Sequence, residues 1–211
     1  MKIEVRTLLA ASAFSNLSAG LLGPIYAIFV QEIGGGILAA SVAWTVFSLV
    51  TGVLILCFGR LEDHRLNKRL MVPVGYFILA FATLGYLFVA TSTELFAIEA
   101  LMGIGVAMLT PAWDAIYSTH LDKGRESSQW AYWDGGTRII YAGGAMLGGL
   151  VATLYGFKTL FILMALFAFC AGAASSLLLR KGKKFSLKHI FKRKKHRKII
   201  AKPMYRRKEN S

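Results

Sequence analysis

Three charged side chains interrupt the long apolar stretches of this chain, namely Glu99, Asp114 and Arg138. An ionisable group held among apolar side chains can exchange a proton or pair with a cation, which is the chemistry of coupled transport. Glu99 lies near the start of its stretch, however, so its carboxylate could instead reach the polar headgroups of a membrane. The sequence leaves both interpretations of Glu99 open.

The elements that carry these residues are six apolar stretches, at 7–30, 37–58, 70–90, 95–117, 137–155 and 159–179. Each is about as long as the ~20 residues that a helix needs to cross a lipid bilayer. The composition agrees, since 55% of the residues are hydrophobic and only 17% are charged. Continuous apolar runs favour helices over the alternating strands of a membrane barrel. We therefore expect an all-α, multi-pass membrane protein with six transmembrane helices.

The basic residues predict how these helices are oriented. If the N-terminus is cytoplasmic, the basic residues at 2–6, 60–69, 123–125 and 180–208 all fall on the cytoplasmic side, and Lys158 falls on the other side. Lys and Arg are enriched in cytoplasmic loops. Both termini are therefore expected in the cytoplasm, with the helices in a plasma membrane or bacterial inner membrane.

Polar side chains recur at helical spacing along the first and fourth stretches. They are Ser12, Asn16 and Tyr26 in 7–30, and Glu99, Thr110 and Asp114 in 95–117. Lipid cannot satisfy such groups, so this flank should face a cavity or a partner. The candidate cavity or coupling residues are Asn16, Tyr26, Glu99, Thr110 and Arg138. Arg138 has two alternatives to a place in the cavity. It could reach the lipid headgroups, or it could pair with Asp134 or Asp114.

A faint internal repeat relates the same two stretches. Pro24 and Pro111 each follow a Leu by two residues, and they lie near opposite ends of their stretches. This relation is expected of two three-helix units of inverted topology, whose helix-interrupting residues sit near a transport path.

The segment between the second and third stretches carries a known signature. Gly59, Leu61 and Asp63 occupy its first, third and fifth positions, and Lys68-Arg69 forms a basic pair. The pattern resembles the loop signature of the major facilitator superfamily, with His64 in place of a basic residue and Asn67 in place of a turn glycine. In that family the region holds a charge cluster that gates the inner side. The resemblance implies such roles for Gly59, Leu61, Asp63, Arg65, Lys68, Arg69 and Asp114.

A second likeness lies in the fifth stretch, where residues 144–149 read Gly-Ala-Met-Leu-Gly-Gly. They resemble a Gly-Pro-x-x-Gly-Gly motif of antiporters, with Ala145 in place of the proline. Glu99 stands where many drug/proton antiporters carry Arg, so the likeness favours the superfamily without assigning antiport. Gly144, Gly148 and Gly149 are predicted to serve helix packing.

The resemblance covers one six-helix half of a family that usually has two. It implies a secondary transporter that moves a small solute by alternating access, with its site between the halves. A homodimer or a second six-helix half would then be required. A split or truncated gene product is one alternative. The other is a six-helix membrane or assembly protein that does not transport and whose tail binds lipid or RNA.

The chain is predicted to divide into a transmembrane domain at 1–180 and a basic cytoplasmic tail at 181–211. The Lys and Arg of the tail should attract anionic headgroups by up to ~1 kcal/mol each. The tail is expected to be disordered or an amphipathic helix on the membrane surface, and binding to nucleic acid is the less favoured alternative. The sequence has no phosphate-binding glycine loop, HExxH or paired-cysteine motif, so neither an enzyme nor a cofactor or metal is expected.

Overall fold

The computed structural model describes the backbone of residues 1–200 and the side chains of residues 1–179. Within these residues all regular secondary structure is helical, which agrees with the predicted fold class. The elements are α1 (Ile3–Leu22), η1 (Gly23–Ile25), α2 (Tyr26–Glu32), α3 (Ile37–His64), α4 (Lys68–Gly85), η2 (Tyr86–Phe88), α5 (Ser92–Thr119) and α6 (Glu126–Ile200). The compact unit Met1–Leu178 contains the sites described below. The predicted role of the 181–211 tail falls on residues whose side chains lie outside the described part.

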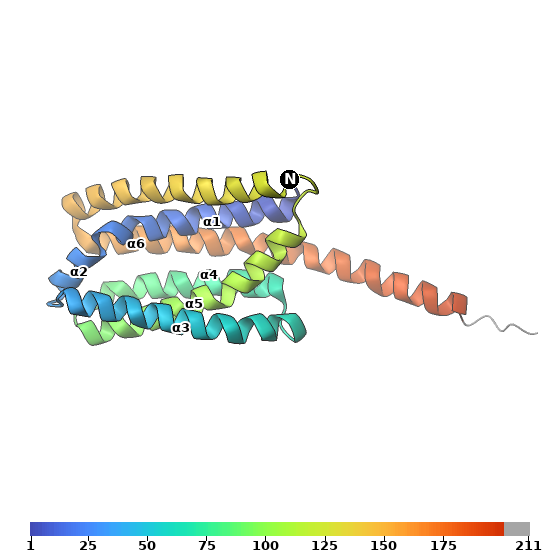
Figure 1. Ribbon diagram of the computed structural model, residues 1–211, viewed down its shortest axis with the longest axis horizontal. Helices are drawn as coiled ribbons and strands as arrows, with labels where there is room; N and C mark the ends of the chain where they lie inside the picture. Colours follow the sequence, from blue (N-terminus) through green and yellow to red (C-terminus); the bar gives the residue numbers. More distant parts are fainter. Residues whose placement is uncertain (201–211) are drawn as a thin grey trace, which may run out of the picture. The chain divides into compact units, whose positions relative to one another are not determined.

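Helix α6 is two helices joined at Gly156. Its apolar part, Glu126–Leu179, has 54 residues, which is far too long for one membrane crossing. Gly156 has φ 78° and ψ 171°, a backbone conformation that glycine adopts without the steric cost of a Cβ. The chain reverses there (Figure 1), so α6 has a first leg, 126–155, and a second leg that begins at 157. Over the described residues, the five helices of membrane length therefore make six crossings.

The first crossing is broken at Pro24. Helix α1 ends at Leu22, a single 3₁₀ turn contains Pro24, and α2 begins at Tyr26. Proline removes a backbone N–H and disfavours helical backbone before it, which explains the break. Pro111 differs, because α5 continues through it. The two prolines thus have different structural effects, and the inverted repeat inferred from them stays a prediction.

Two helix ends differ from the sequence prediction. Helix α3 continues to His64 rather than stopping near residue 58, and the first leg of α6 begins at Glu126 rather than near residue 137. Charged residues such as Glu and Arg are good helix formers, so the end of an apolar run need not end a helix. Most of the predicted loop signature is therefore helical. The turn itself is short, because the Asn67 side chain caps α4 by accepting a hydrogen bond from the Arg69 N–H at 3.1 Å.

Apolar side chains fill both ends of the bundle. One core, at the end that holds Met1, is built from Val5, Leu8, Val72, Trp113, Ile116 and Tyr117, among others. The other, at the end that holds Glu94, is built from Leu21, Phe29, Val30, Tyr86, Leu95 and Phe161, among others. Helix α3 packs mainly against α5 and leaves most of its surface exposed, including Leu38 at 77% and Leu56 at 73%. Such an apolar exposed face is suited to lipid rather than water.

Candidate functional site

Glu99 is held inside the bundle by two tyrosines. The Tyr26 hydroxyl donates to Glu99 Oε1 at 2.6 Å, and the Tyr86 hydroxyl donates to the same oxygen at 2.7 Å. The Glu99 side chain is only 3% exposed. The interpretation that Glu99 reaches the headgroups is therefore wrong. Two hydroxyl donors at one carboxylate oxygen are instead the arrangement that stabilises a buried negative charge.

Interruptions of the α-helices position both tyrosines next to Glu99. Tyr26 is the first residue of α2, directly after the turn that contains Pro24, and Tyr86 is the first residue of η2 at the end of α4. The Tyr86 ring also stacks on Phe161 at a centroid distance of 5.2 Å and meets the edge of Phe29 at 5.9 Å. Helix α5 starts with a capping box in which Thr91 and Glu94 satisfy each other's backbone N–H groups. Local features thus position α2, η2 and α5 separately, and the three elements meet at Glu99.

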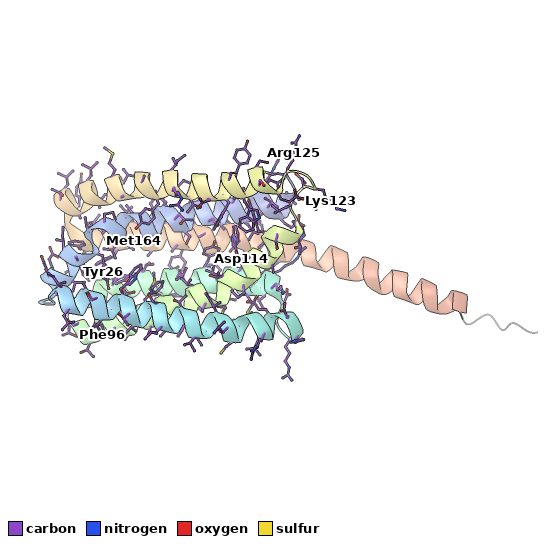
Figure 2. The ribbon with its side chains drawn as sticks, viewed as in Figure 1. Tyr26, Phe96, Asp114, Lys123, Arg125 and Met164 are labelled. Carbon is purple, nitrogen blue, oxygen red and sulfur yellow. The ribbon has the colours of Figure 1, made fainter. Side chains whose placement is uncertain are left out.

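A cavity of about 330 Å³ opens beside Glu99. Its walls come from α1 to α5, both legs of α6 and the two 3₁₀ turns, and Figure 2 shows Tyr26 and Met164 within this part of the bundle. The lining is mostly apolar or aromatic, and it includes Trp44, Phe47, Met102, Tyr141 and Ala168. Among the side chains that the structure describes, none that lines this cavity is basic, and Glu99 is its one acidic group.

A second cavity, of about 280 Å³, lies further along α1 and α5. Asn16, Thr110 and Asp114 line it, as the helical spacing of these residues predicts. The Asn16 amide donates to the Ser12 carbonyl at 2.8 Å, and the Thr110 hydroxyl donates to the Val106 carbonyl at 2.7 Å. Each side chain thus makes a hydrogen bond to a backbone carbonyl of its own helix. The side chains can therefore line the cavity without a partner on another helix.

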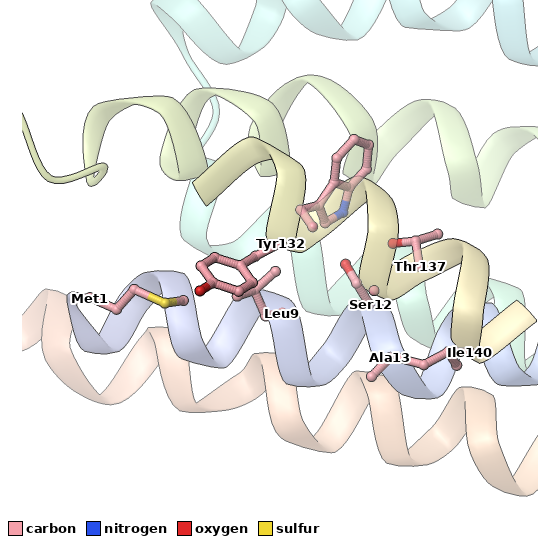
Figure 3. A pocket seen from close by; sticks show the side chains of 9 residues that line it. Met1, Leu9, Ser12, Ala13, Tyr132, Thr137 and Ile140 are labelled. Carbon is pink, nitrogen blue, oxygen red and sulfur yellow. The ribbon is translucent and has the colours of Figure 1, made fainter. Parts of the chain in front are cut away.

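A third cavity, of about 290 Å³, lies between α1 and the first leg of α6. Figure 3 shows Met1, Leu9, Tyr132 and Thr137 around it. The three cavities adjoin. Ser15, Leu79 and Val106 line both the first and the second, and Ser12, Trp133 and Thr137 line both the second and the third. Together the three cavities form a row along α1, which we call the α1 groove.

The signature residues form ion pairs at the Met1 end of the bundle. Lys68 Nζ lies 2.6 Å from Asp63 Oδ1, across the short turn between α3 and α4. An Arg69 guanidinium nitrogen lies 3.8 Å from Glu4 Oε1 on α1. Gly59, Leu61 and Arg65 make no such polar contact in the described part, and Leu61 is 44% exposed.

Asp114 is not part of this cluster. In the described residues no basic side chain lies within 4.0 Å of it, so it does not pair with Arg65, Lys68 or Arg69 of the signature. The reason is geometric, because Asp63 and Glu4 already hold Lys68 and Arg69 near the turn. Asp114 instead faces the second cavity.

Arg138 pairs within its own helix. Its Nε and Nη2 atoms each lie 3.3 Å from an oxygen of Asp134, one turn earlier in the first leg of α6. The Arg138 side chain is 76% exposed and lines none of the three cavities. Of the alternatives open from the sequence, the structure shows the Asp134 pair. Arg138 was also a candidate cavity residue, and it lines none of the cavities described here.

Small residues bring α1 and the first leg of α6 close together. A Cβ added to Gly20 would lie 2.6 Å from the Tyr141 carbonyl oxygen, and one added to Gly144 would lie 2.7 Å from the Leu17 carbonyl oxygen. A Cβ added to Gly148 would lie closer still to the Leu21 carbonyl oxygen. A Cβ on Gly149 would meet nothing within 4 Å, so this glycine does not serve the contact. The close approach is the usual consequence of small residues at a membrane-helix interface.

Several residues of the site were not predicted from the sequence. Tyr86, Trp44 and Tyr141 line the first cavity, yet isolated aromatics in apolar stretches carry no signal that separates them from core residues. Glu62, beside the signature Asp63, is only 4% exposed, and no described group hydrogen-bonds to its carboxylate oxygens. The signal that could have identified Glu62 is a charged residue within the part of α3 that continues beyond the apolar stretch.

Comparison with known proteins agrees with this architecture. Residues 8–209 match the Major Facilitator Superfamily. The chain belongs to this superfamily. An uncharacterized MFS-type transporter of Methanocaldococcus jannaschii is 27% identical over 142 residues, which cover 67% of this chain and 36% of that protein. The uncharacterized MFS-type transporter YitZ of Bacillus subtilis is 21% identical over 155 residues, 74% of this chain and 94% of that protein.

A solved structure shares the superfamily fold. The POT family transporter PepTSo superposes with a TM-score of 0.68 at 15% sequence identity, over 84% of this chain and 37% of that one. The chain thus spans about a third of the length of PepTSo and of the archaeal relative, whereas it matches nearly all of YitZ. It is an integral, multi-pass membrane protein of a transporter superfamily, with roughly half the usual set of crossings.

Proposed function

We propose that this chain is one six-helix half of a secondary transporter that moves a small solute by alternating access. The observation that carries the proposal is the α1 groove. It joins three cavities along one flank of the bundle, and the polar residues of α1 and α5 lie along it. A superfamily site forms between two six-helix halves, so a groove on one half is the expected counterpart of a shared solute path.

A second half must cover the groove for it to serve as a path. Asp114 and Asn16 would otherwise face lipid, which cannot satisfy their polar groups. We propose that the cover is a second copy of this chain or a separate six-helix chain. The match over 155 residues covers 94% of YitZ, so that relative is itself little longer than the matched region, which supports this. Both termini are proposed to be cytoplasmic, from the basic residues of the loops.

Crosslinking tests the proposal. In a chain lacking Cys57 and Cys170, single cysteines at Asn16 and Thr110 report on the groove, and a cysteine at Phe81, which is 60% exposed on α4, reports on the lipid-facing surface. Groove sites should crosslink in native membranes more efficiently than Phe81→Cys. A native mass measurement should then show a complex of two six-helix chains. Equal crosslinking together with a monomeric mass would refute the half-transporter and favour a six-helix membrane protein that does not transport.

A further inference from the structure

The acceptor geometry of Glu99 leaves one carboxylate oxygen available. Tyr26 and Tyr86 both donate to Oε1, and no described residue donates a hydrogen bond to Oε2. Oε2 is not completely buried, although it has no hydrogen-bond partner in the protein. It is therefore accessible from the adjoining space. A ligand in the first cavity would therefore meet a carboxylate oxygen that can accept a hydrogen bond.

No positive charge of the protein neutralises this carboxylate within the described residues. The cavity lining there contains no Lys, Arg or His. Arg138, the basic residue that the sequence offered as a cavity candidate, is exposed and paired with Asp134. A buried charge without a counter-charge is costly, so a cation, either a proton or a ligand, would be stabilised here and an anionic ligand would be repelled.

Two hydroxyls of the cavity are already hydrogen-bonded within the protein, whereas the Ser15 and Tyr141 hydroxyls, which also line it, make no described hydrogen bond. The Ser18 hydroxyl donates to the Met164 carbonyl at 2.8 Å, and the Thr83 hydroxyl donates to the Ala80 carbonyl at 2.8 Å. Most of the remaining wall is apolar or aromatic. A strongly hydrated solute such as a sugar would lose its water at these walls and recover few hydrogen bonds, whereas an apolar body would be accepted.

Aromatic rings surround the space next to Glu99. Trp44 and Phe47 of α3 lie at a centroid distance of 5.4 Å from one another and both line the cavity. Tyr141, on the first leg of α6, and the two tyrosines that bind Glu99 add further faces. Ring faces attract organic cations, most strongly those of Trp. The volume of about 330 Å³ is at the lower end of the range for small-molecule pockets.

From these four observations we infer that the first cavity binds a small organic monocation with an apolar body, such as an aralkyl primary amine. Its ammonium group donates to Glu99 Oε2, and its apolar body lies against Trp44, Phe47 and Tyr141. The inference deepens the proposed transport function by naming a solute class, and it rests on that function for the biological meaning of the binding. The binding itself is a property of this chain.

The test uses three probes of similar size and different charge. 4-Phenylbutylamine, 4-phenylbutanol and 4-phenylbutyrate are measured by equilibrium dialysis against the full chain in lipid nanodiscs, with empty nanodiscs subtracted. The amine should bind more tightly than the alcohol, and the carboxylate should bind least. Equal binding of amine and alcohol would overturn the inference, and it is also the result expected if Glu99 accepts only a proton.

Variants locate the site. Glu99→Gln should weaken binding of the amine by about tenfold or more while leaving the alcohol little changed, because only the charge is lost. The matched control is Glu94→Gln on the same helix, since glutamine retains the capping box. Trp44→Leu, at a surface position that is 63% exposed, should reduce amine binding more than alcohol binding. Unchanged amine affinity in Glu99→Gln would refute the site.

The two proposals fail separately. If the amine series shows no charge preference while cysteines at Asn16 and Thr110 still crosslink, the half-transporter stands and the solute class is wrong. If the amine binds through Glu99 in a chain that stays monomeric, the cation site stands and the two-half transporter is wrong.

Discussion

Tyr26 and Glu99 join two parts of the chain that are 73 residues apart, through a hydrogen bond of 2.6 Å from the Tyr26 hydroxyl to Glu99 Oε1. The bond connects α2, beyond the Pro24 break, to α5, the fourth crossing. Tyr86 donates to the same oxygen at 2.7 Å. Glu99 is thus the point at which the first, third and fourth crossings are held together.

Removing either hydroxyl should destabilise the bundle. Tyr26→Phe and Tyr86→Phe each delete one hydrogen bond to a buried charged group, a loss of about 1–3 kcal/mol. Thermal unfolding of the purified chain in detergent measures the effect. Tyr155→Phe is the control, because that ring is 69% exposed and makes no described hydrogen bond, and its midpoint should stay near that of the wild type. If all three variants unfold at the same temperature, the tyrosines do not hold Glu99.

A methyl group at the contact between α1 and α6 should also be costly. In Gly144→Ala the new Cβ would lie 2.7 Å from the Leu17 carbonyl oxygen, so the helices must separate at a cost of about 1–3 kcal/mol. Gly149→Ala meets nothing within 4 Å and should be neutral or slightly stabilising, since Ala has the higher helix propensity. The paired unfolding midpoints measure the difference. Equal midpoints would contradict the close approach of the two helices at Gly144.

The ion pair between Asp63 and Lys68 should control access to the short turn between α3 and α4. Asp63→Asn removes the charge that holds Lys68 at 2.6 Å, so trypsin should cleave at Arg65 faster in sealed, inverted vesicles. The thermal midpoint should change little, because the pair is partly exposed. Exchanging the two charges, in Asp63→Lys with Lys68→Asp, should restore slow cleavage. A cleavage rate that is unaffected by either variant would remove the gating role proposed for this signature.

Reporter fusions should place both termini on one side of the membrane. An enzyme that is active only in the cytoplasm should work when fused after Ser211 or inserted after Arg65, and it should be inactive when inserted near Glu94. The expectation follows from six crossings together with the basic residues of the loops. An inactive fusion at Ser211, or an active one near Glu94, would contradict six crossings with both termini in the cytoplasm.

Sequence alone was sufficient for the class of fold because a membrane crossing is a local property. Length and apolar character decide whether a segment enters the bilayer, so the six stretches could be identified one by one. The resemblance of 59–69 to the superfamily signature was local in the same sense, and the match over 8–209 confirmed the family. Helix ends were less well predicted, since α3 and α6 extend into charged segments that a hydropathy pattern excludes.

Tertiary packing decided which polar residues meet. The helical spacing of Asn16, Thr110 and Asp114 placed them on one flank, and the second cavity lies there. Glu99 could not be assigned in this way, because its position depends on Tyr26 and Tyr86, which reach it only after α2, η2 and α5 have packed. Arg138 differs from Glu99, because its ion pair with Asp134 lies within one helix and could be foreseen from the sequence. Its exposure, however, depends on which helices pack against α6. Contacts between distant residues carry no periodic signal, and only the folded bundle brings them together.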